Sequence, residues 1–122
     1  MQEIPLIGVV DDDPDIPAAL ASLIRSLGYE AVCFSSAEAL LSSKEVHRFR
    51  CVISDIHMPN LSGLDLIPLL KKLRPDLPII LMTGRFEQSL ADRASLAGAA
   101  ILVTKPFGLD DLLETISRSV RG

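Results

Sequence analysis

The sequence lacks an apolar run long enough to cross a bilayer, because no stretch approaches the roughly 20 apolar residues that a membrane-spanning helix requires. Its first ten residues, MQEIPLIGVV, show neither the basic segment nor the cleavage signature of a secretory leader. Basic residues are also few and hardly clustered: 12 Lys and Arg stand against 16 Asp and Glu, so the basic patch typical of nucleic-acid binders is absent. We therefore expect a cytoplasmic protein that binds neither a membrane nor nucleic acid directly.

Cysteine is scarce as well. The two cysteines, Cys33 and Cys51, do not have the spacing of a metal or redox motif, and both lie in apolar runs, where a free cysteine behaves as a small hydrophobic residue. We predict that both are reduced core residues. The sequence has no repeat, low-complexity tract or linker, and its 122 residues are close to the commonest domain size. Residues 1–122 are therefore expected to form a single domain.

Apolar runs rich in Val and Ile alternate five times with segments of helical periodicity. The runs LIGVV (6–10) and IILM (79–82) are continuously apolar, which is typical of strands buried on both faces, whereas residues 29–34 are mixed and indicate a strand nearer an edge. This alternation predicts an α/β fold of the (βα)₅ type with a parallel sheet.

Capping residues indicate where the first three helices begin. Asp13 followed by a proline predicts the start of a first helix that ends at Gly28. Ser35 with Glu38 has the spacing of a capping box and predicts a short second helix. Ser62 with Asp65 has the same spacing and predicts a third helix that runs to about residue 74. Because Pro68 removes a backbone hydrogen bond, the third helix should be bent or begin later than its cap suggests.

The last two helices differ in how much apolar surface they can bury. The fourth, at about residues 87–97, is mostly polar, which predicts shallow burial and low local stability. The fifth has a clear apolar stripe and should pack firmly on the sheet. The residues expected to face the core are Leu90, Ala94, Leu96 and Ala97 in the fourth helix, and Leu109, Leu112, Leu113, Ile116 and Val120 in the fifth.

Residues suited to phosphoryl chemistry follow four of the predicted strands: Asp11 and Asp12, Asp55, Thr83 and Lys105. In an open parallel sheet the ligand crevice lies beyond the carboxyl ends of the strands, so these residues should converge on one site. Clustered carboxylates repel one another unless a hard cation such as Mg²⁺ joins them. A hydroxyl and an ammonium supply donors and positive charge for a phosphoryl oxygen. The predicted cargo is a phosphoryl group.

Four motifs, VVDDDP, VISDIHMPNLSG, LMTG and TKPF, resemble in order and interval the receiver domain of two-component response regulators. The resemblance covers essentially the whole chain. The runs FSSAEALLSS and LPIILMTG are most similar to receivers of nitrogen-fixation and LuxR-type transcriptional regulators. The resemblance implies a doubly wound, flavodoxin-like fold with a five-stranded parallel sheet in the order 2-1-3-4-5. It also implies a protein that catalyses only its own phosphorylation and dephosphorylation.

Carried over residue by residue, the resemblance implies that Asp55 is the phosphoacceptor, taking a phosphoryl group from a sensor histidine kinase or a phosphotransfer protein. Asp12 and Asp55 would bind Mg²⁺ directly, Asp11 would bind it through a water, and the backbone carbonyl of His57 would complete the protein ligands. The side chain of His57 would not need to take part.

The resemblance further implies that Thr83 donates its hydroxyl to one phosphoryl oxygen and that Lys105 pairs with another. The surface of the fourth helix, fifth strand and fifth helix would switch and is the family's usual place for dimerisation. Receivers usually carry Tyr or Phe three residues before the lysine, where this chain has Leu102. This departure puts the coupling to an output in question.

Two other functions fit part of the pattern. Asp11 and Asp13 have the spacing of a haloacid-dehalogenase-type phosphatase, although Pro14 stands where Thr or Val is usual and Asp55 would have no role. Alternatively, the fold could be a docking surface that works without phosphorylation, a possibility favoured only by Leu102. The chain ends just after the fifth predicted helix, so it is expected to hold no output domain, and a stand-alone receiver and a fragment of a longer regulator both remain open.

Overall fold

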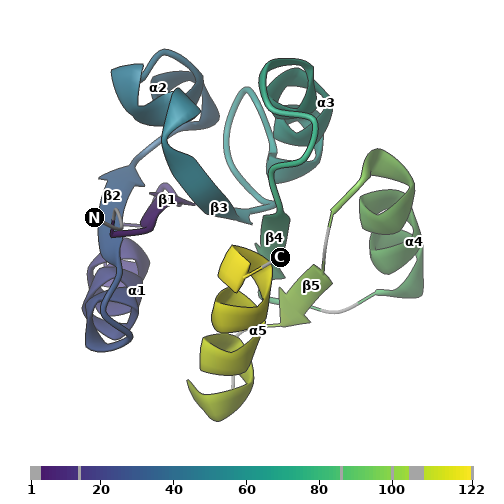
Figure 1. The fold of residues 1–122 in the computed structure, drawn as a ribbon. Coiled ribbons are helices and arrows are strands. Elements are labelled where there is room, and N and C mark those ends of the chain that lie inside the picture. Colours follow the sequence, from purple (N-terminus) through teal and green to yellow (C-terminus); the bar gives the residue numbers. More distant parts are fainter. Residues whose placement is uncertain (1–3, 14, 86, 100, 105–108, 122) are drawn as a thin grey trace.

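The computed structural model describes residues 4–13, 15–85, 87–99, 101–104 and 109–121; for residues 109–113 and 121 it describes the backbone only. Strands and helices alternate along the chain (Figure 1). The strands are β1 (Leu6–Val10), β2 (Glu30–Phe34), β3 (Phe49–Asp55), β4 (Ile79–Thr83) and β5 (Ile101–Thr104). The helices are α1 (Asp15–Ser26), α2 (Ala37–Leu41), the 3₁₀ helix η1 (Lys44–His47), α3 (Gly63–Leu73), α4 (Gln88–Ala97) and α5 (Leu109–Arg121).

All neighbouring strands pair in parallel, in the order β2-β1-β3-β4-β5. The predicted doubly wound (βα)₅ sheet is confirmed, and β2 lies at an edge as its mixed sequence indicated. Figure 1 shows α1 and α5 on one face of the sheet and α2 and α3 on the other. The strand order changes direction between β1 and β3, which is where a crevice is expected at the carboxyl ends of a doubly wound sheet.

Side chains of the central strands fill two buried layers, one on each face of the sheet. In β1, Ile7 and Val9 face the layer that contains Ile116 of α5, whereas Leu6 and Val10 face the opposite layer. Of the predicted stripe of α5, Ile116 is buried and Val120 partly buried. The other three positions, Leu109, Leu112 and Leu113, lie outside the described side chains.

Helix starts agree with the sequence at α3 and differ at α2. The Ser62 hydroxyl accepts the Asp65 backbone N–H, and the Asp65 carboxylate accepts the Ser62 N–H, both at 3.2 Å, so that capping box is confirmed. The predicted cap at Ser35 is wrong: Ser36 is the N-cap, with extended φ and ψ of −152° and 157°, and its hydroxyl accepts the Ala39 N–H. Backbone geometry after the strand decides between two adjacent serines that have the same chemistry.

Pro68 lies inside α3, on its exposed side. The helix begins at Gly63, directly after its cap, so of the two predicted alternatives, a bend or a later start, the later start is wrong. A proline in this position removes one backbone hydrogen bond, and the exposed side of the helix lets water replace it.

Two residues predicted to lie in the core are exposed. Leu96 is 89% exposed because α4 buries Leu90 and Ala94, and a residue two positions after Ala94 points about 200° away around the helix. Cys33 is exposed because β2 is an edge strand, and its thiol donates to the Pro17 carbonyl at 3.5 Å. Cys51, in the central strand β3, is fully buried as predicted, and burial raises the pKa of its thiol to about 12. Cys51 therefore stays a neutral thiol.

Within the described ranges, no helix is both long enough and apolar enough to cross a bilayer.

The side chain of Arg74 ties the end of α3 to η1. Its guanidinium donates a hydrogen bond of 3.0 Å to the Val46 carbonyl. We expect Arg74→Ala to lower the free energy of unfolding by about 1 kcal/mol, because a partly buried hydrogen bond from a charged donor is lost. Urea denaturation of this variant beside Lys72→Ala, an exposed position on the last turn of α3, measures the difference. Equal stabilities of the two variants would contradict the prediction.

Candidate functional site

Three carboxylates from two adjacent strands meet at the carboxyl edge of the sheet. Asp11 and Asp12 directly follow β1, and Asp55 is the last residue of β3, its neighbour in the sheet. One candidate ligand atom from each lies within 4.8 Å of the others. Asp11 and Asp55 are 2% and 6% exposed, whereas Asp12 is open to solvent. We call these three residues the acid cluster.

The acid cluster suits a hard divalent cation. Three negative charges at this separation repel one another, and burial of two of them weakens the screening by water. Mg²⁺ prefers oxygen ligands such as carboxylates, and it keeps part of its water shell. The solvent-exposed Asp12 side of the cluster leaves room for those waters. The residues present therefore fit the Mg²⁺ site that the sequence predicted.

Asp13 does not belong to the acid cluster. Its carboxylate accepts the backbone N–H of Asp15 at the start of α1, at 2.8 Å, and its own N–H donates to the Asp11 carboxylate at 3.0 Å. Asp13 is therefore a capping residue, which removes one half of the Asp11–Asp13 pair that a phosphatase of the haloacid-dehalogenase type would need.

Thr83 ends β4, next to the acid cluster, because the sheet register pairs Asp55 with Met82. The Thr83 side chain is fully buried. Its hydroxyl donates to the Arg85 carbonyl at 3.0 Å and accepts the Arg85 N–H at 3.2 Å. The hydroxyl oxygen also lies 3.2 Å from Nε2 of His57.

Sequence reasoning missed this contact of the His57 side chain. The signal was present: His57 lies two residues beyond the end of β3, and Thr83 ends the neighbouring parallel strand. Side chains at the ends of adjacent strands can reach each other across the strand spacing of about 5 Å.

The loop that carries His57 is fixed at both ends by the backbone. The Ile56 N–H donates to the Met82 carbonyl at 2.9 Å, and the Gly63 N–H donates to the Ile56 carbonyl at 3.1 Å. Between them, Asn60 adopts a left-handed conformation with φ of 68°, which Asn tolerates better than most residues. The loop therefore holds the backbone beside Asp55 in one arrangement.

Lys105, the remaining predicted site residue, lies outside the described residues. Leu102 lies in β5, where it pairs with Leu81, and is partly buried against the core layer under α2, α3 and α4. An aliphatic side chain thus occupies the position where the resemblance implied an aromatic one.

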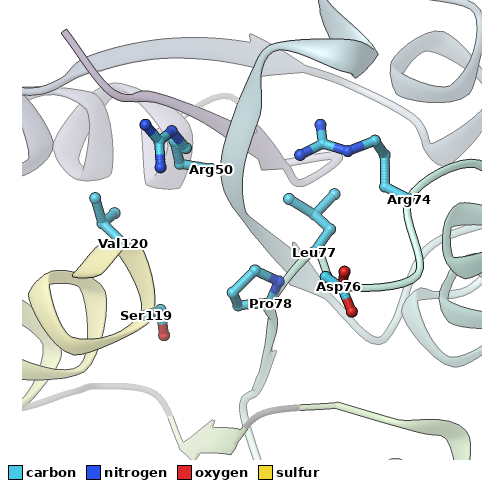
Figure 2. Close-up of a pocket in the computed structure, with 7 residues that line it drawn as sticks. All are labelled: Arg50, Arg74, Asp76, Leu77, Pro78, Ser119 and Val120. Atoms are coloured by element: carbon cyan, nitrogen blue, oxygen red, sulfur yellow. The ribbon is translucent and has the colours of Figure 1, made fainter. Parts of the chain in front are cut away.

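A hollow lies at the end of the strands opposite the acid cluster (Figure 2). It has a volume of about 210 Å³ and is lined by Arg50, Arg74, Asp76, Leu77, Pro78, Ser119 and Val120. Arg50 is the second residue of β3, whereas Asp55 is the last, so the hollow and the acid cluster lie at opposite ends of the strands. The guanidinium of Arg74 is engaged with Val46, as described above.

Binding of Mg²⁺ to the acid cluster should stabilise the fold. A ligand that binds only the native state stabilises it by about 2.7 kcal/mol at 100 times its dissociation constant. We expect Mg²⁺ to raise the melting temperature, EDTA to reverse this, and Asp12→Asn to weaken it. Thermal scans in NaCl of matched ionic strength are the control, and an equal gain in NaCl would show that general screening of charge is responsible.

Comparison with known proteins gives a consistent result. Residues 7–117 match the family model described as "Response regulator receiver domain". The chain is 40% identical over 116 residues to the response regulator protein TmoT of Ectopseudomonas mendocina, covering 95% of this chain and 53% of TmoT. It is 36% identical to the transcriptional regulatory protein FixJ of Bradyrhizobium diazoefficiens, covering 94% of this chain and 56% of FixJ. The chain thus spans about half the length of these relatives.

Among solved structures, the BeF3-activated receiver domain of DrrB, a protein of Thermotoga maritima, is similar with a TM-score of 0.90 and 29% identity. The match covers 98% of this chain and all of that one.

Proposed function

The chain belongs to the response regulator receiver family, and from this premise we propose that it is a phosphorylatable switch of two-component signalling. Asp55 would accept a phosphoryl group from a histidine kinase or a phosphotransfer protein. The observation that carries the proposal is the acid cluster, in which a nearly buried Asp55 lies within 4.8 Å of Asp11 and Asp12. The Thr83 hydroxyl at the adjacent strand end supports it.

In the proposed reaction, a carboxylate oxygen of Asp55 attacks the phosphorus atom of the donor. The new O–P bond forms as the bond from phosphorus to the donor nitrogen breaks, and the electron pair stays on the departing imidazole. The hydrogen-bonded loop after β3 would hold Asp55 in line with the donor, so catalysis would be mostly positioning. The protein would act only on itself.

The proposed metal ligands are the side chains of Asp12 and Asp55, the Asp11 side chain through a water, and the backbone carbonyl of His57. Bound Mg²⁺ would neutralise charge on the carboxylates and on the phosphoryl oxygens. Thr83 would donate its hydroxyl to one phosphoryl oxygen, and Lys105 would pair with another.

Phosphorylation would favour a second arrangement of the Thr83 loop and of the surface formed by α4, β5 and α5. A ligand shifts such an equilibrium only through contacts that differ between the two states, and the Thr83 hydroxyl supplies one. We propose this surface for homodimer contact as well. Leu102 cannot turn an aromatic ring in or out, so the output would depend on movement of the backbone and of Thr83.

The relatives are longer than this chain, and one of them is called a transcriptional regulatory protein. We propose that the complete regulator joins this receiver to an output domain.

The experiment that tests the function is intact mass spectrometry after incubation with a small acyl-phosphate donor and Mg²⁺, beside the same sample with EDTA. We expect one alkali-labile phosphoryl adduct that forms only with Mg²⁺. An adduct of equal yield in EDTA, or one that resists alkali, would contradict a metal-assisted aspartyl phosphate. Absence of any adduct from this donor and from a phosphorylated histidine kinase would favour a domain that docks without phosphorylation.

A further inference from the structure

The hydrogen-bonding capacity of the Thr83 hydroxyl is fully used in this structure. A hydroxyl has one proton to donate and two lone pairs that accept. The proton goes to the Arg85 carbonyl, and one lone pair accepts the Arg85 N–H. The second lone pair remains for the contact with Nε2 of His57, at 3.2 Å.

This arrangement determines the direction of the His57 bond. With the Thr83 proton assigned to the Arg85 carbonyl, which can only accept, we assign the hydrogen of the second contact to Nε2 of His57, which makes the imidazole the donor. The imidazole is exposed, whereas the hydroxyl that it contacts belongs to a fully buried side chain. His57 therefore holds Thr83 from the solvent side.

A phosphoryl oxygen only accepts hydrogen bonds. To donate to a phosphoryl oxygen, the Thr83 hydroxyl must give up its hydrogen bond to the Arg85 carbonyl and rotate toward the phosphoryl group. The bond from Nε2 of His57 stabilises the orientation that the side chain has to leave. His57 and the phosphoryl group thus compete for the same hydroxyl.

We infer that His57 is a positioning residue that holds Thr83 in its resting orientation and so lowers the affinity of the site for a phosphoryl group. The inference rests on the proposed function, since it concerns the Thr83 hydroxyl as a phosphoryl ligand. It assigns to the imidazole a role distinct from that of the His57 backbone carbonyl.

The test is a titration of the intact chain with beryllofluoride, a mimic of the phosphoryl group, at saturating Mg²⁺. Loss of one net hydrogen bond of about 1 kcal/mol or less changes an equilibrium by up to about fivefold. We expect His57→Ala to bind beryllofluoride about threefold more tightly than wild type. His57→Gln keeps an N–H donor at similar reach, so its affinity for beryllofluoride should lie between those of wild type and His57→Ala. Equal or weaker binding by His57→Ala would overturn the inference.

A second measurement reads the orientation of Thr83 directly. The chain has three threonines, so methyl labelling gives three signals, and Thr83→Ser identifies that of Thr83. In His57→Ala without beryllofluoride, the Thr83 methyl signal should move toward its position in the beryllofluoride-bound wild type. An unmoved signal would mean that the imidazole does not hold the side chain.

The chain offers a matched control in its only other histidine, His47, which is exposed in η1. His47→Ala should bind beryllofluoride as wild type does. Titration with Mg²⁺ alone should give the same affinity in wild type and in the His57 and His47 variants, because these substitutions leave the backbone carbonyl of residue 57 in place. A change in Mg²⁺ affinity large enough to explain the whole change in beryllofluoride affinity would overturn the inference. If wild type and Asp55→Asn both fail to bind beryllofluoride, the proposed function itself fails, which is a different result.

Discussion

Asp55→Asn is expected to abolish the Mg²⁺-dependent phosphoryl adduct completely. The amide has the shape of the carboxylate, but its oxygen is a far weaker nucleophile, and the substitution removes one negative charge from the proposed metal site. The two remaining carboxylates would bind a divalent cation less tightly than three. Intact mass after incubation with the acyl-phosphate donor measures the loss.

The variant should still fold, because Asn fills the same volume and one charge fewer remains in a cluster whose ligand atoms lie within 4.8 Å. The matched control is Asp76→Asn, an exposed position that lines the hollow at the end of the strands opposite the acid cluster (Figure 2). Asp76→Asn should form as much adduct as wild type. An adduct that persists in Asp55→Asn but disappears in Asp11→Asn would move the nucleophile to Asp11 and support the phosphatase alternative.

Gly63→Ala is expected to have the next largest effect, although residue 63 takes no part in the chemistry. A Cβ atom on Gly63 would overlap the carbonyl oxygen of Asp55 and lie 3.0 Å from the Cα atom of Ile56. Both are backbone atoms and cannot swing aside, so the start of α3 or the loop after β3 must move. We expect a loss of stability of about 2 kcal/mol, which is typical of overpacking at a tight contact.

The same movement should displace Asp55 and the His57 carbonyl. A shift of 1 Å in a reacting group can cost on the order of 100-fold in rate, and we expect a fall of that order in the rate of adduct formation. Urea denaturation and the time course of adduct formation measure the two effects. For stability the control is Gly84→Ala, because a Cβ there would meet nothing within 4 Å among the described residues. Equal behaviour of Gly63→Ala and Gly84→Ala would show that the close approach is unimportant.

Local sequence patterns were sufficient where neighbours along the chain decide the outcome. The continuously apolar run 6–10 became β1, an interior strand buried on both faces, and the mixed run at residues 29–34 became the edge strand β2. The Ser62–Asp65 capping box depends only on residues three apart on one helix, and it formed as predicted. The convergence of Asp11, Asp12 and Asp55 also followed from sequence, since parallel strands end at the same edge.

Predictions failed where a segment distant in sequence decides which side chain is buried or where a helix begins. Leu96 and Cys33 have apolar side chains, but the face that α4 buries is set by α3 and β5, and the edge position of β2 leaves Cys33 uncovered. The choice of Ser36 over Ser35 followed the exit of the chain from β2.

The sequence by itself therefore determined the fold class, the position of the acid cluster and the residues suited to phosphoryl chemistry, because these depend on periodicity and on where strands end. Only the tertiary structure decided that Nε2 of His57 lies within hydrogen-bonding distance of the Thr83 hydroxyl and that a Cβ on Gly63 would overlap the Asp55 carbonyl. Those spacings relate residues of different elements, and their precision comes from packing of the whole domain, which no local pattern encodes.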